Sequence, residues 1–191
     1  MSAAVSSMRE RIRYEMLDGR VRAMAPQSSN HKIVADNLYR IFSTALRGKK
    51  CMAFADGMDV KLTETDKVVP DMIVVCNRDI IKSHAVHGAP DLLVEVLSPS
   101  SVKRDRGYKK DLYERCGVKE YWIVDTNRLS VEIYTLAEGK LEFHNLFEII
   151  PEDEFNVMDE EERAEIVYEF SPFLFPEINI ELSEIFEDMI K

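Results

Sequence analysis

Three short, largely apolar runs constrain the fold of this chain more than any other feature. They cover residues 68–76, 90–97 and 120–125. Each has the length of a β-strand and falls well below the ~20 residues that a membrane-spanning helix needs. Strands that are apolar on both faces are typical of the centre of a sheet with cover on each side. The chain is therefore predicted to build its core around such a sheet.

Two helices are predicted beside these strands. Residues 31–46 carry apolar side chains at helical spacing, after the polar residues 28–30, which can cap a helix, and before Gly48. Residues 103–115 are predicted to form a more polar helix that ends at Gly117, since glycine is typical just after a helix.

Turn signals predict three hairpins, over residues 9–22, 51–62 and 131–150. The first two turn at Asp18-Gly19 and Asp56-Gly57, a dipeptide that favours tight hairpin turns. The mixture of helices, hairpins and apolar strands favours an α/β fold in which a mixed β-sheet is sandwiched by α-helices, with an α+β sandwich as the alternative.

The charge of the chain is distributed unevenly along its length. Residues 148–191 hold 15 acidic and 2 basic residues, whereas residues 1–147 carry a net charge of +3, and the whole chain carries −10. Residues 1–150 are predicted to form one domain, and residues 151–191 an acidic extension packed on it. The extension is either a solvated acidic surface or a segment that screens a site for a polyanion.

The three cysteines, Cys51, Cys76 and Cys116, are odd in number and widely spaced, and no CxxC pair occurs. Neither a disulfide framework nor a cysteine metal site is expected, which fits a reducing cytoplasm. The first ten residues hold no apolar run of the signal-peptide type. A cytoplasmic protein with no membrane partner is the prediction.

Two carboxylates stand on the apolar runs. Asp71 opens one run and Glu95 lies inside another, on the face that it shares with Asp91, Leu93 and Leu97. On neighbouring strands the two acids would converge, and they would both stay ionised only with a cation between them. Oxygen ligands without cysteine suit Mg²⁺ or Mn²⁺. The alternatives are a turn role for Asp71 and a structural ion pair between Glu95 and an arginine.

The predicted helix at 103–115 adds positive charge. Asp105, Lys109 and Tyr113 are four residues apart and therefore share one helix face. One interpretation directs Lys109 toward the carboxylates and leaves Arg104 or Arg106 to bind phosphates. The other interpretation is an ordinary solvated helix face.

Several motifs occur together in a characteristic order. They are Asp18-Gly19, His31, Pro70-Asp71, the run Pro-Asp-Leu-Leu-Val-Glu-Val-Leu-Ser-Pro-Ser at 90–100, then Asp105, Lys109 and Tyr113, and Gly-Val-Lys-Glu-Tyr-Trp-Ile-Val-Asp at 117–125. Over roughly residues 10–150 the chain resembles the Uma-type family of restriction endonucleases, a branch of the PD-(D/E)XK nuclease superfamily. The resemblance implies a restriction-endonuclease-like core with a mixed sheet of four or five strands between helices.

The resemblance also implies roles for particular residues. Asp71 matches the aspartate of the superfamily motif and Glu95 matches its second acid. The motif lysine should follow two residues later, where this chain has Leu97. Lys109, on the next helix, is the candidate for the displaced lysine, because some members of the superfamily carry it elsewhere.

Further roles follow from the same resemblance. The backbone carbonyl of Val96 is expected to complete the metal ligands, and His31 and Asp91 are candidates for neighbours that orient them, with Glu15 a weaker one. The family implies a homodimeric endonuclease that uses Mg²⁺ or Mn²⁺ to cleave nucleic acid, with DNA as the predicted substrate. The alternative is a dimeric binding or regulatory module without catalysis, which Leu97 and the acidic extension favour.

Overall fold

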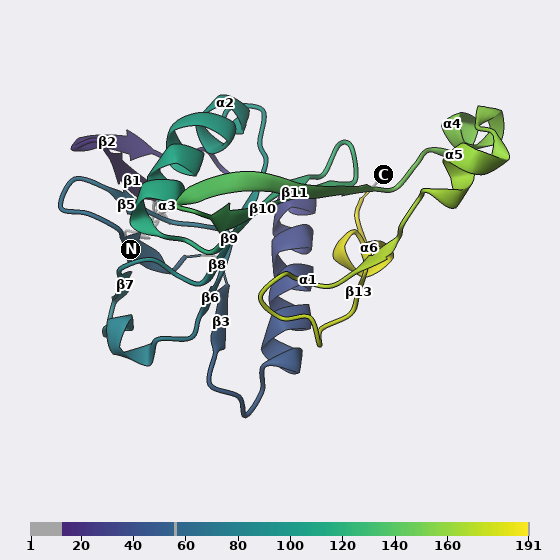
Figure 1. Cartoon of the computed structure of the whole chain (residues 1–191). Coiled ribbons are helices and arrows are strands. Elements are labelled where there is room, and N and C mark those ends of the chain that lie inside the picture. The colour runs from purple at the N-terminus through teal and green to yellow at the C-terminus, as the bar shows by residue number, and fades with distance from the viewer. Residues whose placement is uncertain (1–12, 56, 191) are drawn as a thin grey trace, which may run out of the picture.

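The computed structural model describes residues 13–55 and 57–190. Its centre is a six-stranded mixed sheet, the main sheet, in the order β11-β10-β9-β8-β6-β3 (Figure 1). The strands are β3 (Met52–Ala55), β6 (Met72–Val75), β8 (Leu92–Val96), β9 (Glu120–Asp125), β10 (Ser130–Ala137) and β11 (Lys140–Glu148). Only the β8–β9 pair within the main sheet is parallel. The three apolar runs thus supply interior strands of the main sheet, as predicted, although the first run contributes only residues 72–75 to β6.

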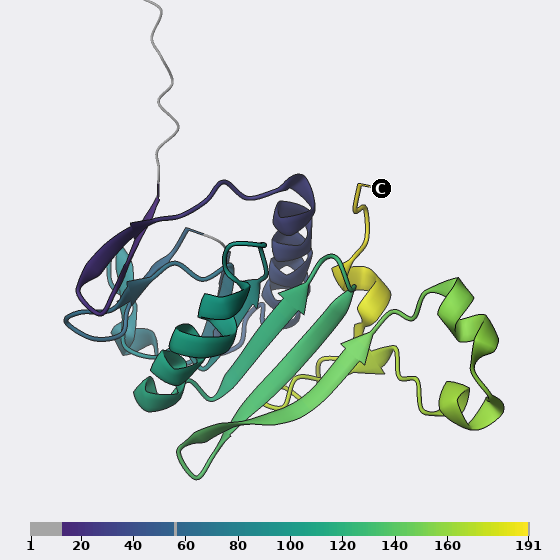
Figure 2. The same ribbon diagram turned by 90° about the horizontal axis from the view of Figure 1, so that it is seen from above.

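Helices cover both faces of the main sheet. Helix α1 (Ser29–Ala45) lies on one face, where its Val34, Leu38 and Phe42 enter an apolar core with Trp122. The other face carries a helical segment, kinked at Gly107, that is formed by α2 (Val102–Arg104), the π-helical turn η2 (Asp105–Lys109) and α3 (Lys110–Cys116). Figures 1 and 2 show the sheet between these helices. The predicted α/β fold with a sandwiched mixed sheet is confirmed.

A second, five-stranded sheet lies beside the main one, in the order β2-β1-β5-β4-β7. Its strands are β1 (Tyr14–Leu17), β2 (Arg20–Ala23), β4 (Asp59–Lys61), β5 (Lys67–Val68) and β7 (Ala85–His87). A 3-10 turn, η1 (Arg78–Ile80), precedes β7 in the chain. The hairpin predicted at Asp18-Gly19 forms between β1 and β2, although residues 9–12 of that prediction lie outside the described residues. Both turn residues have positive φ, as a tight hairpin requires.

Two strand predictions are wrong. Residues 51–62 do not form a hairpin, because β3 pairs with β6 in the main sheet whereas β4 pairs with β5 and β7. The apolar run at 68–76 is not one strand either, since it ends β5 at Val68 and resumes as β6 at Met72. Pro70 cannot donate a ladder hydrogen bond, so the break occurs there and Asp71 directly precedes β6.

The cysteine prediction is also corrected. Cys51 and Cys76 form a disulfide, and Cys116 is the free cysteine. The register of β3 and β6 pairs Met52 with Val75, which makes the two cysteines the next opposite pair. They are 25 residues apart in sequence, so only the strand pairing reveals their proximity.

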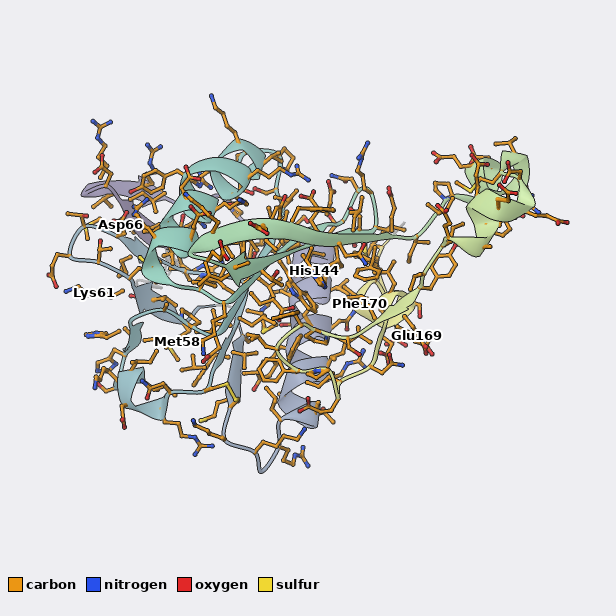
Figure 3. All side chains as sticks on the ribbon, viewed as in Figure 1. Met58, Lys61, Asp66, His144, Glu169 and Phe170 are labelled. Atoms are coloured by element: carbon orange, nitrogen blue, oxygen red, sulfur yellow. A yellow bond between two sulfur atoms is a disulfide. The ribbon has the colours of Figure 1, made fainter. Side chains whose placement is uncertain are left out.

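The C-terminal region divides into two parts. Helices α4 (Glu152–Val157) and α5 (Glu160–Ala164) project from the β11 side of the body, far from the β1–β2 hairpin (Figures 1 and 2). The chain then returns through β12 (Glu169–Phe170), β13 (Ile180–Glu181) and α6 (Leu182–Ile185), whose apolar side chains join the α1-side core. Phe170, labelled in Figure 3, stacks on Phe147 with ring centroids 4.2 Å apart. The predicted boundary at residue 150 stays a prediction.

Among the helices of residues 13–55 and 57–190, none combines the length and the apolar composition that a bilayer-spanning segment needs.

Candidate active site

Asp71 and Glu95 meet at one end of the main sheet. Strands β6 and β8 are antiparallel, with Met72 opposite Val94, so Asp71 lies at the position opposite Glu95. The Asp71 amide donates to the carbonyl of Val94 (3.2 Å). Because directly opposite side chains share a face, both acids are on the face covered by η2 and α3. The expected convergence of the two acids therefore occurs.

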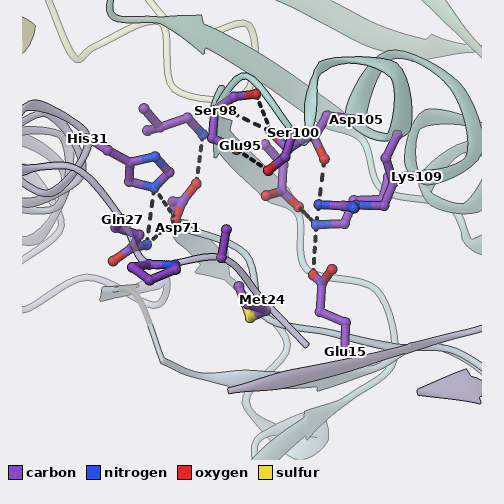
Figure 4. Close-up of a pocket in the computed structure, with 15 residues that line it drawn as sticks. Glu15, Met24, Gln27, His31, Asp71, Glu95, Ser98, Ser100, Asp105 and Lys109 are labelled. Atoms are coloured by element: carbon purple, nitrogen blue, oxygen red, sulfur yellow. Dashed lines mark hydrogen bonds and ion pairs between the residues drawn. The ribbon is translucent and has the colours of Figure 1, made fainter. Parts of the chain in front are cut away.

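Lys109 supplies a buried ammonium group at this point (Figure 4). Its Nζ lies 2.9 Å from Oε1 of Glu95 and 2.7 Å from Oε1 of Glu15, with Oδ1 of Asp105 at 3.7 Å. The side chain is only 3% exposed. The Tyr113 hydroxyl donates to the same Glu95 oxygen (2.5 Å). The predicted face of Asp105, Lys109 and Tyr113 thus points at Glu95, although the helix widens into the π-helical turn η2 on the way.

The other acid, Asp71, is held from three directions. Its Oδ2 accepts from the backbone amide of Val96 (2.7 Å), and its Oδ1 accepts from Gln27 Nε2 (2.9 Å) and lies 2.8 Å from His31 Nε2. His31 stands in the first turn of α1, where its amide donates to the N-cap side chain of Ser28 (3.2 Å). The helix cap therefore fixes the histidine that orients the aspartate.

The pocket around these residues is short of positive charge. Burial raises the pKa of the Glu95 carboxyl well above its usual range; Lys109 opposes this, but the nearby carboxylates of Asp105, Asp71 and Glu15 reinforce it. Burial also raises the pKa of Asp105, against the effect of Lys109. For Lys109, burial works against the charge, but the surrounding carboxylates outweigh it and raise the pKa of the ammonium. The ammonium group of Lys109 thus lies among three carboxylates, those of Glu15, Glu95 and Asp105.

The donor set suits a hard divalent cation. Within the described ranges, no three or more His, Cys, Asp or Glu side chains gather into a metal site of their own. Mg²⁺, however, is usually held by only one or two carboxylates and keeps several waters. Asp71, Glu95 and the carbonyl-bearing Val96 line a pocket of about 50 Å³, which is room for more than one water. Two oxygen ligands and an excess of negative charge fit Mg²⁺ or Mn²⁺.

The remaining predicted residues lie in different surroundings. Arg104 lines the pocket, and its buried Nε has no hydrogen-bond partner in the described part of the chain. Arg106 does not line the pocket and instead pairs with Glu132 on β10. Asp91 accepts from the Cys76 amide and pairs with Lys119, both at 2.7 Å, and it lies four residues from Glu95 along the chain, roughly 13 Å on an extended strand.

One contributor to the site was not predicted. Gln27 lies in the connection before α1, and nothing in its local sequence distinguishes it. Tyr113 was predicted to share a face with Lys109, and the spacing of four residues was the signal for its contact with Glu95. Glu15, a weak candidate from the sequence, proves to be a direct partner of Lys109.

Comparison with known proteins decides the family. Residues 3–159 match the Uma2 family, which is described as "Putative restriction endonuclease". The chain belongs to the Uma2 family. A Synechocystis protein described as "Uncharacterized protein slr1290" is 31% identical over 128 residues, which cover 66% of this chain and 67% of that protein. The resemblance drawn from the sequence motifs is confirmed.

A solved structure shares the fold. It is the crystal structure of a protein from Anabaena variabilis described as "a putative nuclease belonging to DUF820". The TM-score is 0.67 at 16% sequence identity, and the match covers 91% of this chain and 89% of that one. The likeness therefore extends over nearly the whole Uma2 chain described above.

Proposed function

We propose that this Uma2 protein is a Mg²⁺-dependent endonuclease that hydrolyses phosphodiester bonds, with DNA as its substrate. One observation carries the proposal: Asp71 and Glu95 are opposite each other, and the ammonium group of Lys109 lies 2.9 Å from Glu95. Leu97 occupies the usual position of the motif lysine, and the helix supplies an equivalent cation from Lys109, which lies 14 residues after Glu95. This argues against the loss of catalysis that Leu97 alone favours.

The two carboxylates and the Val96 carbonyl are the groups that would hold Mg²⁺. When bound, the ion lowers the pKa of a water and offsets charge on the phosphate. Asp71 is prepared for this role because Gln27 and His31 fix its Oδ1. Residues that hydrogen-bond to a metal ligand orient that ligand. Loss of such a residue typically lowers metal affinity or activity by roughly 10–100-fold.

Lys109 has one N–H donor left for the reaction. An ammonium group has three donors. Glu15 and Glu95 lie within 3 Å of Nζ, whereas Asp105 at 3.7 Å is beyond hydrogen-bond distance. The third donor is proposed to orient the attacking water or to stabilise negative charge on the phosphate oxygens in the transition state.

Arg104 is the proposed phosphate ligand at the mouth of the pocket. Its buried Nε has no partner among the described residues, and a guanidinium binds phosphate oxygens in a planar, two-pronged geometry. Arg106 would have to give up its pairing with Glu132 to take the same role.

A cleavage assay tests the proposal. Supercoiled plasmid, short DNA duplexes, single strands and RNA are incubated with the purified protein in Mg²⁺, in Mn²⁺ and in a chelator. We expect metal-dependent cleavage by the wild type, none by Asp71→Asn, and unchanged cleavage by the control Asp36→Asn on the exposed side of α1. Cleavage that survives Asp71→Asn rules out the assigned site. Binding without cleavage by any metal and substrate supports the non-catalytic module instead.

A further inference from the structure

The β1–β2 hairpin forms one wall of the pocket and has a basic face. Glu15 on β1 lines the pocket, as do residues 24–27, which follow β2. The register pairs Glu15 with Arg22 and Leu17 with Arg20. Because opposite residues share a face, both arginines lie on the same side of the hairpin as Glu15, which is the side toward the pocket.

The hairpin is open to a ligand along this strand. β2 is the edge strand of the second sheet, and all four of its residues are exposed, with Val21 at 69%. Its neighbours on β1, Glu15 and Leu17, are by contrast buried. An edge strand with exposed arginines is held rigidly by its partner strand while its side chains remain free to reach outward.

The opposite wall of the pocket is also basic. It is formed by the Ser98–Ser101 loop and by Arg104 of helix α2, next to the exposed Lys103. Figure 1 shows the hairpin and α2 in the half of the molecule away from α4 and α5, and Figure 4 shows Glu15 and Ser98 on opposite sides of the pocket. The acidic helices α4 and α5 lie at the far end, so their charge does not cancel that of these two walls.

We propose that Arg20 and Arg22 of the β1–β2 hairpin bind consecutive backbone phosphates of the nucleic-acid strand that enters the pocket between the hairpin and α2. The proposal rests on the proposed nuclease function and adds the path of the substrate. The two arginines are two residues apart, roughly 7 Å along the strand. Arg22 is opposite Glu15, whose carboxylate touches the Lys109 ammonium, so a phosphate on Arg22 lies next to the reacting one.

Binding and cleavage measured separately test this path. Fluorescence anisotropy of a labelled DNA duplex follows binding to the full chain, in an Asp71→Asn background with Mg²⁺, as NaCl is varied. Arg20→Ala/Arg22→Ala should weaken binding by at least about tenfold and reduce the salt slope by about two, since each lost phosphate contact lowers that slope by about one. Arg20→Lys/Arg22→Lys should retain most of the slope.

The matched control is Arg47→Ala/Lys50→Ala, two exposed cations beyond the far end of α1. It should change affinity by less than about twofold by the same reasoning on phosphate contacts. If the wild type cleaves DNA but Arg20→Ala/Arg22→Ala and Arg47→Ala/Lys50→Ala bind the duplex with equal affinity, the hairpin path is wrong and the nuclease function stands. If the wild type neither binds nor cleaves DNA or RNA, both proposals fail. An equal loss of affinity for DNA and RNA supports contact with the phosphate backbone.

Discussion

Two buried glutamates on neighbouring strands have opposite surroundings. Glu120 on β9 is fully buried, and its oxygens accept from Trp122 Nε1 (2.7 Å) and from the amides of Phe173 (3.0 Å) and Leu174 (2.9 Å). Glu95 on β8 is 4% exposed and faces charged groups instead. The two side chains lie on opposite faces of the main sheet, Glu120 toward α1 and Glu95 toward α3.

The difference separates a structural carboxylate from the one proposed to bind a metal ion. Burial raises the pKa of both, so the pKa shift by itself does not distinguish them. Three N–H donors satisfy Glu120 and tie the returning C-terminal segment to the main sheet. Around Glu95 the negative charges outnumber the single ammonium, which leaves a demand for a cation.

The largest expected effect comes from Glu95→Gln. The substitution keeps the shape and removes the proposed metal ligand, so cleavage should fall by about 10²–10³-fold, the range for the loss of one transition-state contact. Stability should not fall, because one of three crowded carboxylates loses its charge. Initial cleavage rates and urea unfolding measure both. A stable variant with full activity would remove Glu95 from the mechanism.

Lys109→Met should give the largest loss of stability. It leaves the buried carboxylates of Glu15, Glu95 and Asp105 without their cation, and breaking a buried ion pair from one side costs about 3–5 kcal/mol. Urea unfolding measures the loss. Adding Glu95→Gln to this variant should restore part of the stability. A double variant no more stable than Lys109→Met would contradict an excess of negative charge among the carboxylates around Lys109.

Glu120→Gln should show the reverse of Glu95→Gln. An amide has only one oxygen and adds an NH₂ group among N–H donors, so about 1–3 kcal/mol of stability should be lost. Cleavage at a temperature where the variant is folded should match the wild type. A marked loss of rate there would show that the α1 face also contributes to the site.

The smallest effect is a pH dependence of the metal-free protein. Because the folded-state pKa of Glu95 is raised, its protonation stabilises the fold below the ordinary value of 4.5, and this contribution is lost as the pH rises through the raised pKa. Unfolding from pH 5 upward should therefore show wild type losing stability relative to Glu95→Gln. Mg²⁺ should reduce the difference, and parallel curves in chelator would contradict the raised pKa.

The sequence was sufficient for the centre of the fold. Apolar runs and helical periodicity depend on local burial, so they located β6, β8, β9 and α1 correctly. Partner choice is not local, and the Asp-Gly turn at 56–57 could not reveal that β3 and β4 join different sheets. The disulfide between Cys51 and Cys76 was missed for the same reason.

The candidate site followed the same pattern. Asp71 and Glu95 were recognisable because acids are expensive inside apolar strands, and Lys109 because helical spacing gave its face. Asp91 satisfies the same strand pattern but lies with Cys76 and Lys119 instead. Alternation along a strand predicts on which face of the sheet a side chain lies, but not which groups it contacts. Those contacts are known only from the structure.

Divalent-cation binding distinguishes the two glutamates most directly. Mn²⁺ titrations followed by electron paramagnetic resonance can be compared for wild type, Glu95→Gln and Glu120→Gln at one pH. We expect wild type and folded Glu120→Gln to bind Mn²⁺ with equal affinity and Glu95→Gln to bind at least about tenfold more weakly. Equal Mn²⁺ affinity in Glu95→Gln and wild type would contradict a cation site at the end of β6 and β8.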